Sequence, residues 1–453
     1  MKNHALAIAV LLLAVVGVPQ VADGARPHKH APPRPDAVLA WNEIAADAML
    51  AIGIDPMHES RVYAMEQIAV HDALNAIQRR SQPYAFIGTS PGASPEAAVA
   101  TAAHDVLVVV LQQLPAVPFG AAIGPAVDEV NAAYQAALAA IPDGSAKQLG
   151  VTLGHDSAAA IIARRATDGS DMPFFDTTPI VDPDPGDFQW VEGQPFQVVP
   201  KWAEVTPFVM TSPSQLRPPP PYDLTSDAYA HDFNELKELG GTESTTRTKK
   251  QTEIAFYWFE NSPSKWNRIA RTVSAKAHLG MWDNARLFAL LGVVEADGYI
   301  GNWESKQFYN RWRPETAVRQ ADTDGNERTD ADPTWTPLWG SSGATPEYDS
   351  GHTIEGAAAA VVLANVFGTD RVNFRDCSYT FVDWAPTKLS PENNCDGKHP
   401  IFRTYHSFSR AARENGVSRI YIGWHFRNAV EMGYVHGTQL GNLAVSAFFQ
   451  PTH

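Results

Sequence analysis

The chain has 453 residues, with 35 Lys and Arg against 50 Asp and Glu, so its formal net charge is −15. Hydrophobic residues make up 44% and charged residues 19% of the sequence, which is typical of a globular protein and unlike a disordered chain. The acidic balance argues against nucleic acid as a partner, because binding to a phosphate backbone needs a concentrated basic face. It leaves room for a small basic pocket that binds an anion.

The first 25 residues have the pattern of a signal peptide. Lys2 precedes an apolar run from Ala5 to Val18, which at 14 residues is shorter than a membrane-spanning helix. Small residues follow at Ala22 and Ala25, where we expect cleavage. We therefore predict a signal peptide over residues 1–25, a linker over 26–36, and one exported domain, secreted or periplasmic, over 37–453. An uncleaved membrane anchor is the alternative.

Helical periodicity begins after the linker and continues along most of the chain. Val38, Trp41, Ala45 and Ala48 fall on one helical face. The pattern predicts further helices over residues 62–77, 95–114, 120–141, 146–166, 227–239, 248–259, 267–275 and 284–299. Residues 170–223 are rich in Pro and acidic residues and predict a long irregular excursion. We find no strand ladder and no fixed repeat, so the predicted fold is mainly α, a helical bundle with long irregular loops.

The two cysteines, Cys377 and Cys395, have C-x₁₇-C spacing in a loop-like stretch. In an exported protein this pair predicts a disulfide. No CxxC partner lies nearby, which argues against a zinc site.

Three short stretches in the last third of the chain carry the chemistry. The first is Lys306, followed by six residues and then Arg313-Pro314. On a helix ending at Pro314, positions seven apart share one face, and two long basic side chains converge on one anion. A solvated basic face is the alternative.

The second stretch is Ser350-Gly351-His352, which leads into an apolar segment over residues 356–367. A helix that begins here offers backbone N–H groups and its dipole to an anion, and Gly351 allows close approach. An ordinary Ser N-cap with an incidental His is the alternative.

The third stretch is Ser418-Arg419, followed by five residues and then His425. Ser418 and His425 are seven apart and are expected to share a helical face, and Gly423 loosens the intervening turn. The alternative is a core histidine bound to a backbone carbonyl. Together the three stretches suggest a site for a tetrahedral or trigonal-bipyramidal oxyanion.

Other candidate residues are assigned to structure rather than chemistry. His71, Asp72, His155 and His406 are interpreted as packing and hydrogen-bonding residues. Residues 322–326 (Asp-Thr-Asp-Gly-Asn) predict a surface turn rather than a calcium-binding EF-hand, because Gly is at the fourth position and no Glu stands at the twelfth.

In this order, KX₆RP, PxxxSGH and SRX₅H resemble the superfamily of vanadium-dependent haloperoxidases and type 2 phosphatidic acid phosphatases. Asp297-Gly298 and Trp303-Glu304, upstream of Lys306, look like the haloperoxidase form of the first motif. The N-terminal helices, with residues 71–77 as His-Asp-Ala-Leu-Asn-Ala-Ile, resemble the secreted bacterial haloperoxidase-like branch. The resemblance covers most of the mature chain, with the catalytic motifs in residues 297–433.

The resemblance implies a role for each motif residue. The oxygens of bound vanadate or phosphate are held by Lys306, Arg313, Ser350, Gly351 and Arg419. His425 is the axial vanadium ligand, or the nucleophile in a phosphatase. His352 is the general acid–base.

Three positions depart from the family pattern. The superfamily places an Asp four residues after the second histidine, where it orients the imidazole, and this chain has Ala429 there. Asn428 and Glu431 are the neighbouring candidates to replace it. Asp349 stands where many relatives have Pro, which adds a negative charge beside the anion pocket. Thr345 occupies a position that bears on halide choice in haloperoxidases.

The leading functional hypothesis is an enzyme that binds vanadate and oxidises halide with hydrogen peroxide. The first alternative is an acid phosphatase that acts on a phosphoester through a phosphohistidine on His425 and needs no vanadate. The second is a non-catalytic oxyanion binder. All three have small-molecule partners, and none involves nucleic acid or, after signal cleavage, a membrane span. The sequence makes no prediction of the oligomeric state.

Overall fold

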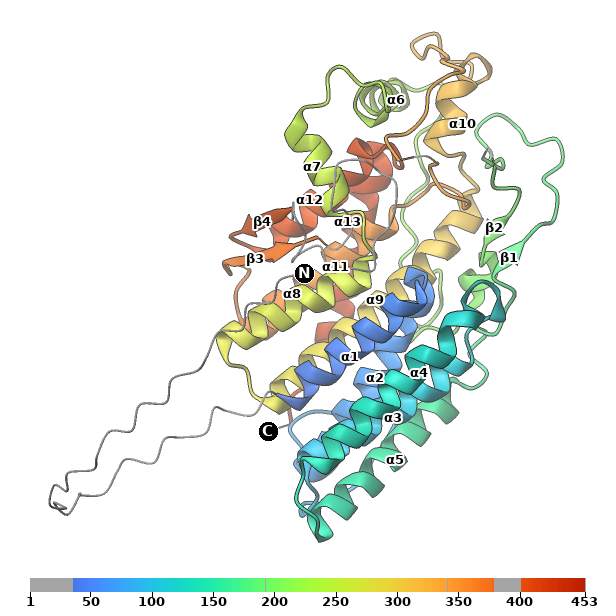
Figure 1. Ribbon diagram of the computed structural model, residues 1–453. Coiled ribbons are helices and arrows are strands. Elements are labelled where there is room, and N and C mark those ends of the chain that lie inside the picture. The colour runs from blue at the N-terminus through green and yellow to red at the C-terminus, as the bar shows by residue number, and fades with distance from the viewer. Residues whose placement is uncertain (1–35, 192, 340, 379–400, 453) are drawn as a thin grey trace, which may run out of the picture. The chain divides into compact units, whose positions relative to one another are not determined.

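The structure, a computed structural model, describes residues 36–191, 193–339, 341–378 and 401–452. The predicted signal peptide, residues 26–35 of the linker, and Cys395 lie outside these ranges, so the export signal and the disulfide stay predictions. The described residues form 13 α-helices, two 3₁₀ helices and two small antiparallel sheets (Figure 1), which confirms the mainly α prediction.

The bounds of the helices are α1 Ala37–Ile52, α2 Pro56–Ile77, α3 Pro95–Gln112, α4 Ala116–Ala139, α5 Ser145–Arg165, α6 Asp227–Gly240, α7 Lys249–Tyr257, α8 Ser262–Ala277, α9 Met281–Tyr309, α10 Pro314–Arg319, α11 Gly351–Phe367, α12 Phe408–Tyr421 and α13 Arg427–Ala447, with 3₁₀ helices η1 at Pro200–Glu204 and η2 at Ala321–Thr323. The helices from α1 to α9 overlap the predicted segments, although α2, α8 and α9 are longer than predicted, and α13 was not predicted.

The expectation of no strands was wrong in a small way. Strand β1 (Phe175–Asp176) pairs with β2 (Gln197–Val198), and β3 (Phe374–Cys377) pairs with β4 (Phe402–Tyr405). These strands have two to four residues each, which is too short for a period-2 pattern to be visible in the sequence.

Helix α9 is the central element of the bundle. It has 29 residues, and most of its side chains from Asn284 to Lys306 are buried. It packs against α2 on one side and against α11 and α13 on another, so it lies between the α1–α5 group and the C-terminal helices (Figure 1). The first two-thirds of α9 therefore belong to the core, and its last turns lead into the candidate site.

Local sequence fixes where the helices begin and how closely they approach one another. Asp55 caps α2 by accepting the N–H groups of Met57 and His58 at 3.0 and 3.1 Å, and Pro56 follows at the first helical position. Gly154 on α5 has no room for a Cβ, which would lie 2.7 Å from the carbonyl oxygen of Ala98 on α3. This contact lets α3 and α5 pack backbone to backbone.

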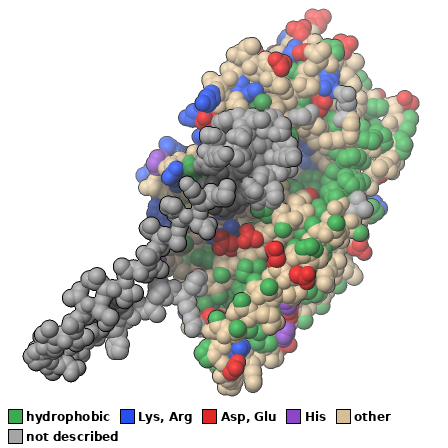
Figure 2. Space-filling view, in the orientation of Figure 1, with side chains coloured by type: hydrophobic (Ala, Val, Ile, Leu, Met, Phe, Trp, Pro, Cys, Tyr) green, Lys and Arg blue, Asp and Glu red, His purple; other side chains and the backbone are tan. Residues whose placement is uncertain are grey.

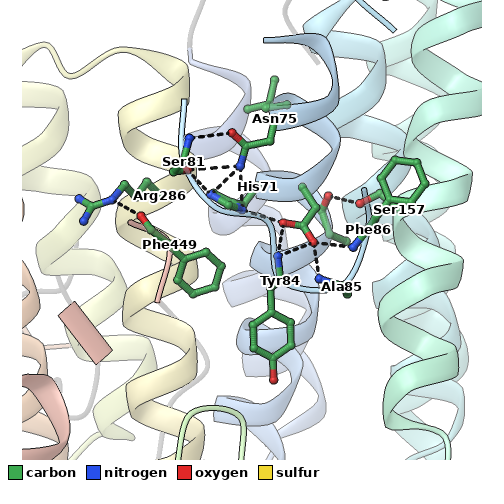
Figure 3. A network of polar contacts seen from close by, with 12 residues as sticks. His71, Asn75, Ser81, Tyr84, Ala85, Phe86, Ser157, Arg286 and Phe449 are labelled. Carbon is green, nitrogen blue, oxygen red and sulfur yellow. Dashed lines mark hydrogen bonds and ion pairs between the residues drawn. The ribbon is translucent and has the colours of Figure 1, made fainter. Parts of the chain in front are cut away.

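Two buried aspartates fix the irregular segments to the helices. Asp297 on α9 accepts the N–H groups of Phe208, Val209 and Met210 at 2.5 to 2.8 Å, which fixes residues 208–210 of the 170–223 excursion. Asp72 on α2 accepts three successive N–H groups of residues 84–86 in the same way, in the network of Figure 3. These motif aspartates are therefore structural anchors.

One described helix has the length and apolar character of a membrane span. This helix is α3, and 61% of its apolar window is buried inside the protein. It packs against α2, α4 and α5, as a core helix does. On the face shown in Figure 2, acidic and basic side chains are interspersed with hydrophobic ones.

Candidate anion-binding site

Turns, rather than shared helix faces, bring the predicted cations together. Helix α9 ends at Tyr309, and Arg313 is the N-cap of α10, so the expected helix through Lys306 and Arg313 was wrong. Pro314 starts a helix instead of ending one, because a proline is well accommodated at the first helical position.

The third motif also differs from the prediction, since α12 ends at Tyr421 and His425 lies in the turn before α13. Gly423 in that turn has φ +86°, a left-handed conformation that favours glycine. The carbonyl oxygen of Arg419 accepts the N–H groups of Trp424 and His425 at 3.0 and 3.3 Å. The turn therefore holds Arg419 beside His425 although they do not share a helical face.

The second motif forms a helix start, as expected. Ser350 is the N-cap of α11, whose first backbone N–H groups have no partner within the helix. A Cβ on Gly351 would lie 2.9 Å from Asn302 Oδ1 and 3.2 Å from the Tyr299 ring on α9. Only a glycine therefore allows α11 to begin this close to α9.

The three cations Lys306, Arg313 and Arg419 are buried, with at most 5% of each residue exposed. Their hydrogen bonds within the described part of the chain all go to neutral oxygens, and no carboxylate there lies within 4 Å of any of them as an ion-pair partner. Lys306 Nζ donates to the carbonyls of Pro346 and Glu347, both at 2.8 Å. The charge of the cluster is therefore not neutralised by ion pairs.

Counting donors shows what these cations have left for a ligand. Arg313 uses three of its five N–H groups on Thr345 O, Thr345 Oγ1 and Trp424 O at 2.5, 2.6 and 3.3 Å, and keeps two. Arg419 donates to Ser418 Oγ and Trp258 O, and its buried Nη1 has no partner among the described residues. Lys306 keeps one N–H. The unused donors come from α9, the start of α10 and α12, and N–H donors of this kind suit an oxyanion.

Burial lowers the pKa of each basic group in the cluster. It lowers the pKa of Arg313 to about 10 and that of Arg419 to about 9, and it lowers the pKa of Lys306 well below its ordinary value, with the Arg313 charge adding to the effect. Burial, and then the charges of Lys306, Arg313 and Arg419, lower the pKa of His425. A bound anion would reverse these shifts by supplying the missing negative charge.

The carboxylate that orients His425 is Glu347. Its Oε1 lies 2.9 Å from His425 Nδ1 and accepts the N–H of Phe426 at 3.0 Å. This arrangement favours the proton on Nδ1 and leaves Nε2 free as a ligand or nucleophile. Burial raises the pKa of Glu347 to about 7, against the lowering effect of Lys306 and Arg313.

The two sequence candidates for this role were wrong. The Asn428 N–H donates to Asp232 Oδ2 at 2.8 Å, and Glu431 lies 3.5 Å from Arg427 on the exposed side of α13. Ala429 therefore needs no neighbour to replace its missing carboxylate, because Glu347 supplies one from the second motif.

Asp349 makes its hydrogen bonds to residues other than the pocket cations, but its charge acts on Lys306, whose pKa it raises against the effect of burial. Its Oδ2 lies 3.1 Å from His436 Nδ1, and its Oδ1 accepts the Asn302 amide at 2.9 Å. Thr345, the position linked with halide choice, holds Arg313 through its hydroxyl and its carbonyl. In this chain Thr345 therefore positions a cation.

His352 lies between the cation cluster and a cavity of about 620 Å³, which it lines together with Trp424. Its Nε2 is 3.3 Å from the carbonyl oxygen of Glu260. Burial, and then the Arg419 charge, lower the pKa of His352 well below its usual range, so the ring is neutral at neutral pH. The short connection between α7 and α8 thus supplies carbonyls to both Arg419 and His352, which no motif pattern indicated.

The residues assigned to structure lie elsewhere. His71 is buried, with Nε2 2.7 Å from Ser81 Oγ and Nδ1 2.9 Å from Asp72 (Figure 3). His155 contacts Asp105, and His406 contacts Asn373 at 2.7 Å. The 322–326 segment is a turn in which Asp324 accepts the Asn326 N–H. Their assignment as packing and turn residues agrees with these contacts.

Known proteins resemble this chain in both sequence and fold. Residues 286–452 match the family model of the VCPO second helical-bundle domain. Over 236 residues the chain is 26% identical to the vanadium chloroperoxidase of Curvularia inaequalis, a match that covers 42% of this chain and 38% of that protein.

Among solved structures, the first bacterial vanadium-dependent iodoperoxidase superposes with a TM-score of 0.74 at 22% identity, over 94% of this chain and 100% of that one. A bacterial vanadium-dependent chloroperoxidase in its apo form superposes with a TM-score of 0.66 at 19% identity, over 86% and 93% of the two chains.

The fold is therefore the helical bundle of the vanadium haloperoxidases. Residues 286–452, which contain the three motifs, are similar to the VCPO second helical-bundle domain, and the sequence match covers less than two thirds of the curated relative.

Proposed function

We propose that this protein is a vanadate-dependent haloperoxidase that oxidises halide with hydrogen peroxide. The observation that supports the proposal is the cluster of Lys306, Arg313 and Arg419, three buried cations with unused N–H groups and no carboxylate partner in the described ranges. Such a cluster is costly to keep charged without an anion, and guanidinium forks match tetrahedral oxyanions.

The donor set fits vanadate. Arg419 Nη1 is a buried donor without a partner, and the start of α11 adds backbone N–H groups. Lys306, Arg313, Ser350, Gly351 and Arg419 would hold the oxygens. His425 Nε2 would bind the vanadium, with Nδ1 fixed by Glu347. Bound vanadate supplies the Lewis-acid centre that activates hydrogen peroxide.

His352 is the proton-transfer residue of the proposal. Its Nε2–H points at the Glu260 carbonyl, so Nδ1 remains as the acceptor for a peroxide proton. The neutral state of the ring at neutral pH suits it to accept that proton. We also propose, from residues 1–25, that the protein is exported.

Bromination of a reporter diketone tests the proposal directly. Purified protein receives hydrogen peroxide and bromide, with and without orthovanadate, and with phosphate as a competitor. We expect turnover that requires vanadate and is suppressed by phosphate. If the protein binds vanadate without brominating the diketone, and hydrolyses a phosphoester, the phosphatase replaces the proposed function. If neither reaction occurs, the protein is an oxyanion binder.

A further inference from the structure

The cavity beside His352 has two unlike walls. Its volume of about 620 Å³ falls in the range of small-molecule sites. One wall is apolar and aromatic, formed by residues such as Ile54, Phe259 and Trp424, with the last two rings 5.4 Å apart between centroids. The other wall carries the carboxyl groups of Glu43 and Asp47 from α1 and Glu59 from α2.

The arginines that also line the cavity make no ion pair with the acidic wall, although burial raises the pKa of Asp47 against a lowering effect of the Arg271 charge. Arg268 pairs with Glu260 and with Asp376, at 2.7 and 2.9 Å. Arg271 donates to the side-chain oxygen of Asn42 at 2.5 Å. None of the three wall carboxyls has an ion-pair partner within 4 Å among the described residues. Figure 2 shows acidic side chains gathered over the α1–α8 region of this face.

Glu59 is the deepest of the three carboxyls and the most unusual. It is 1% exposed, accepts a hydrogen bond from the Ser264 hydroxyl on Oε1, and has no partner for Oε2 in the described ranges. Burial raises its pKa to about 8, so it is mostly protonated at neutral pH. An unpartnered buried carboxyl on a cavity wall is a group that a ligand can complete.

We propose that this cavity binds an organic ammonium compound with an aromatic body, the amine at Glu59 and the ring against Phe259 and Trp424, and presents it to His352. Aromatic side chains also attract cations through their faces, which adds to the carboxyl wall. As the substrate class of the candidate site, this inference rests on the proposed function. An electron-rich ring held beside His352 is the nucleophile that an oxidised halogen attacks, with loss of a ring proton.

The proposal has a signature that does not depend on catalysis. A cation within 4 to 6 Å lowers a carboxyl pKa by 1 to 3 units, so ligand binding at pH 7 should release about 0.4 to 0.9 protons from Glu59. The other charged or titratable groups around Glu59 are Asp55, Tyr63, Glu260, Glu295, Tyr299 and Glu355. A substitution of Glu59 distinguishes proton release by Glu59 from proton release by these neighbouring groups.

The experiment is calorimetric titration of the full chain with phenethylammonium at pH 7, in buffers of different ionisation enthalpy, without vanadate, peroxide or halide. We expect binding with proton release, about tenfold weaker binding of neutral 2-phenylethanol, and no release in Glu59→Gln. Glu66→Gln is the matched control, because Glu66 is equally buried on α2 with a pKa raised to about 8 but does not line the cavity.

Three results would overturn the proposal: no binding of phenethylammonium, equal affinity for 2-phenylethanol, or proton release that persists in Glu59→Gln. In the bromination assay, wild-type protein should prefer tyramine to 4-ethylphenol about tenfold, and Glu59→Gln should lose that preference. Binding without any peroxidase turnover would leave the cavity assignment standing and reject the proposed reaction. Peroxidase turnover without binding of phenethylammonium would reject the cavity assignment and leave the proposed reaction standing.

Discussion

Replacing Arg313 by Met removes one of the three buried cations while keeping much of the side-chain volume. Arg313 has two N–H groups left after its bonds to Thr345 and Trp424. Hydrogen bonds that involve a charged group contribute about 1.5–3 kcal/mol each, so losing two costs about 3–6 kcal/mol of anion binding. At about 1.4 kcal/mol per factor of ten, we expect vanadate and phosphate to bind roughly 10²- to 10⁴-fold more weakly.

The matched control is Arg247→Met. Arg247 is also partly buried and also bonds to neutral oxygens, those of Leu239, Gly241 and Thr252, but it lies between α6 and α7 away from the cluster. Calorimetric titration with orthovanadate, and separately with phosphate, gives the dissociation constants. Without anion, Arg313→Met should unfold at a temperature close to that of wild type, because it also removes a desolvated charge. An affinity within threefold of wild type in Arg313→Met would refute the site.

Three further predictions concern other parts of the structure. Glu347→Ala should abolish the preference of His425 for the Nδ1–H tautomer, seen in imidazole ¹⁵N shifts, whereas Glu431→Gln should not; an unchanged tautomer would exclude Glu347 as the orienting group. Glu66 has a pKa raised by burial from 4.5 to about 8, so the folded state loses stability as pH rises through that window. In urea unfolding, the free energy of unfolding of Glu66→Gln should rise relative to that of wild type by about 1.4 kcal/mol per pH unit between about pH 4.5 and 8. A difference that does not change with pH would contradict the raised pKa of Glu66. Gly437→Ala should destabilise the protein by about 1–3 kcal/mol in the same assay, since its Cβ would meet the Ile354 carbonyl of α11; wild-type stability would mean that α13 can move away.

The helices were predictable because their signals are local. Asp55-Pro56 starts α2, and Ser94-Pro95 starts α3, through capping and fixed proline geometry within a few residues. The apolar stripe of α1, from Val38 to Ile52, faces the core as its periodicity predicts. The short strands were missed because pairs such as β3 with β4 depend on a distant partner.

The candidate site was predictable in its residue types and not in its geometry. The three motifs indicate cations, a helix start and two histidines, but the sequence placed Arg313 and His425 on helix faces that turns replace. Glu347 lies 78 residues before His425, and nothing in the sequence connects the two. Spacing rules extend over a few turns of helix, whereas such a pair is set by the packing of α11 against α13.

Comparing two clusters of buried cations in this fold shows why one is a candidate ligand site and the other is not. Lys265 and Arg268 are as buried as Lys306 and Arg313, but Glu260 and Asp376 pair with them at 2.7 to 2.9 Å. That cluster is neutral and ties β3 to α8, and its partner Glu260 supplies the carbonyl that contacts His352.

The candidate site uses the same residue types with carbonyl and hydroxyl partners instead. Neutral oxygens fix the direction of the N–H groups without cancelling the charge, so the positive potential remains for a ligand. Because the desolvation of these cations is offset only when an anion arrives, binding the anion should also stabilise the fold. The choice of carbonyls over carboxylates around Lys306, Arg313 and Arg419 is therefore the feature that separates a binding site from a structural ion pair.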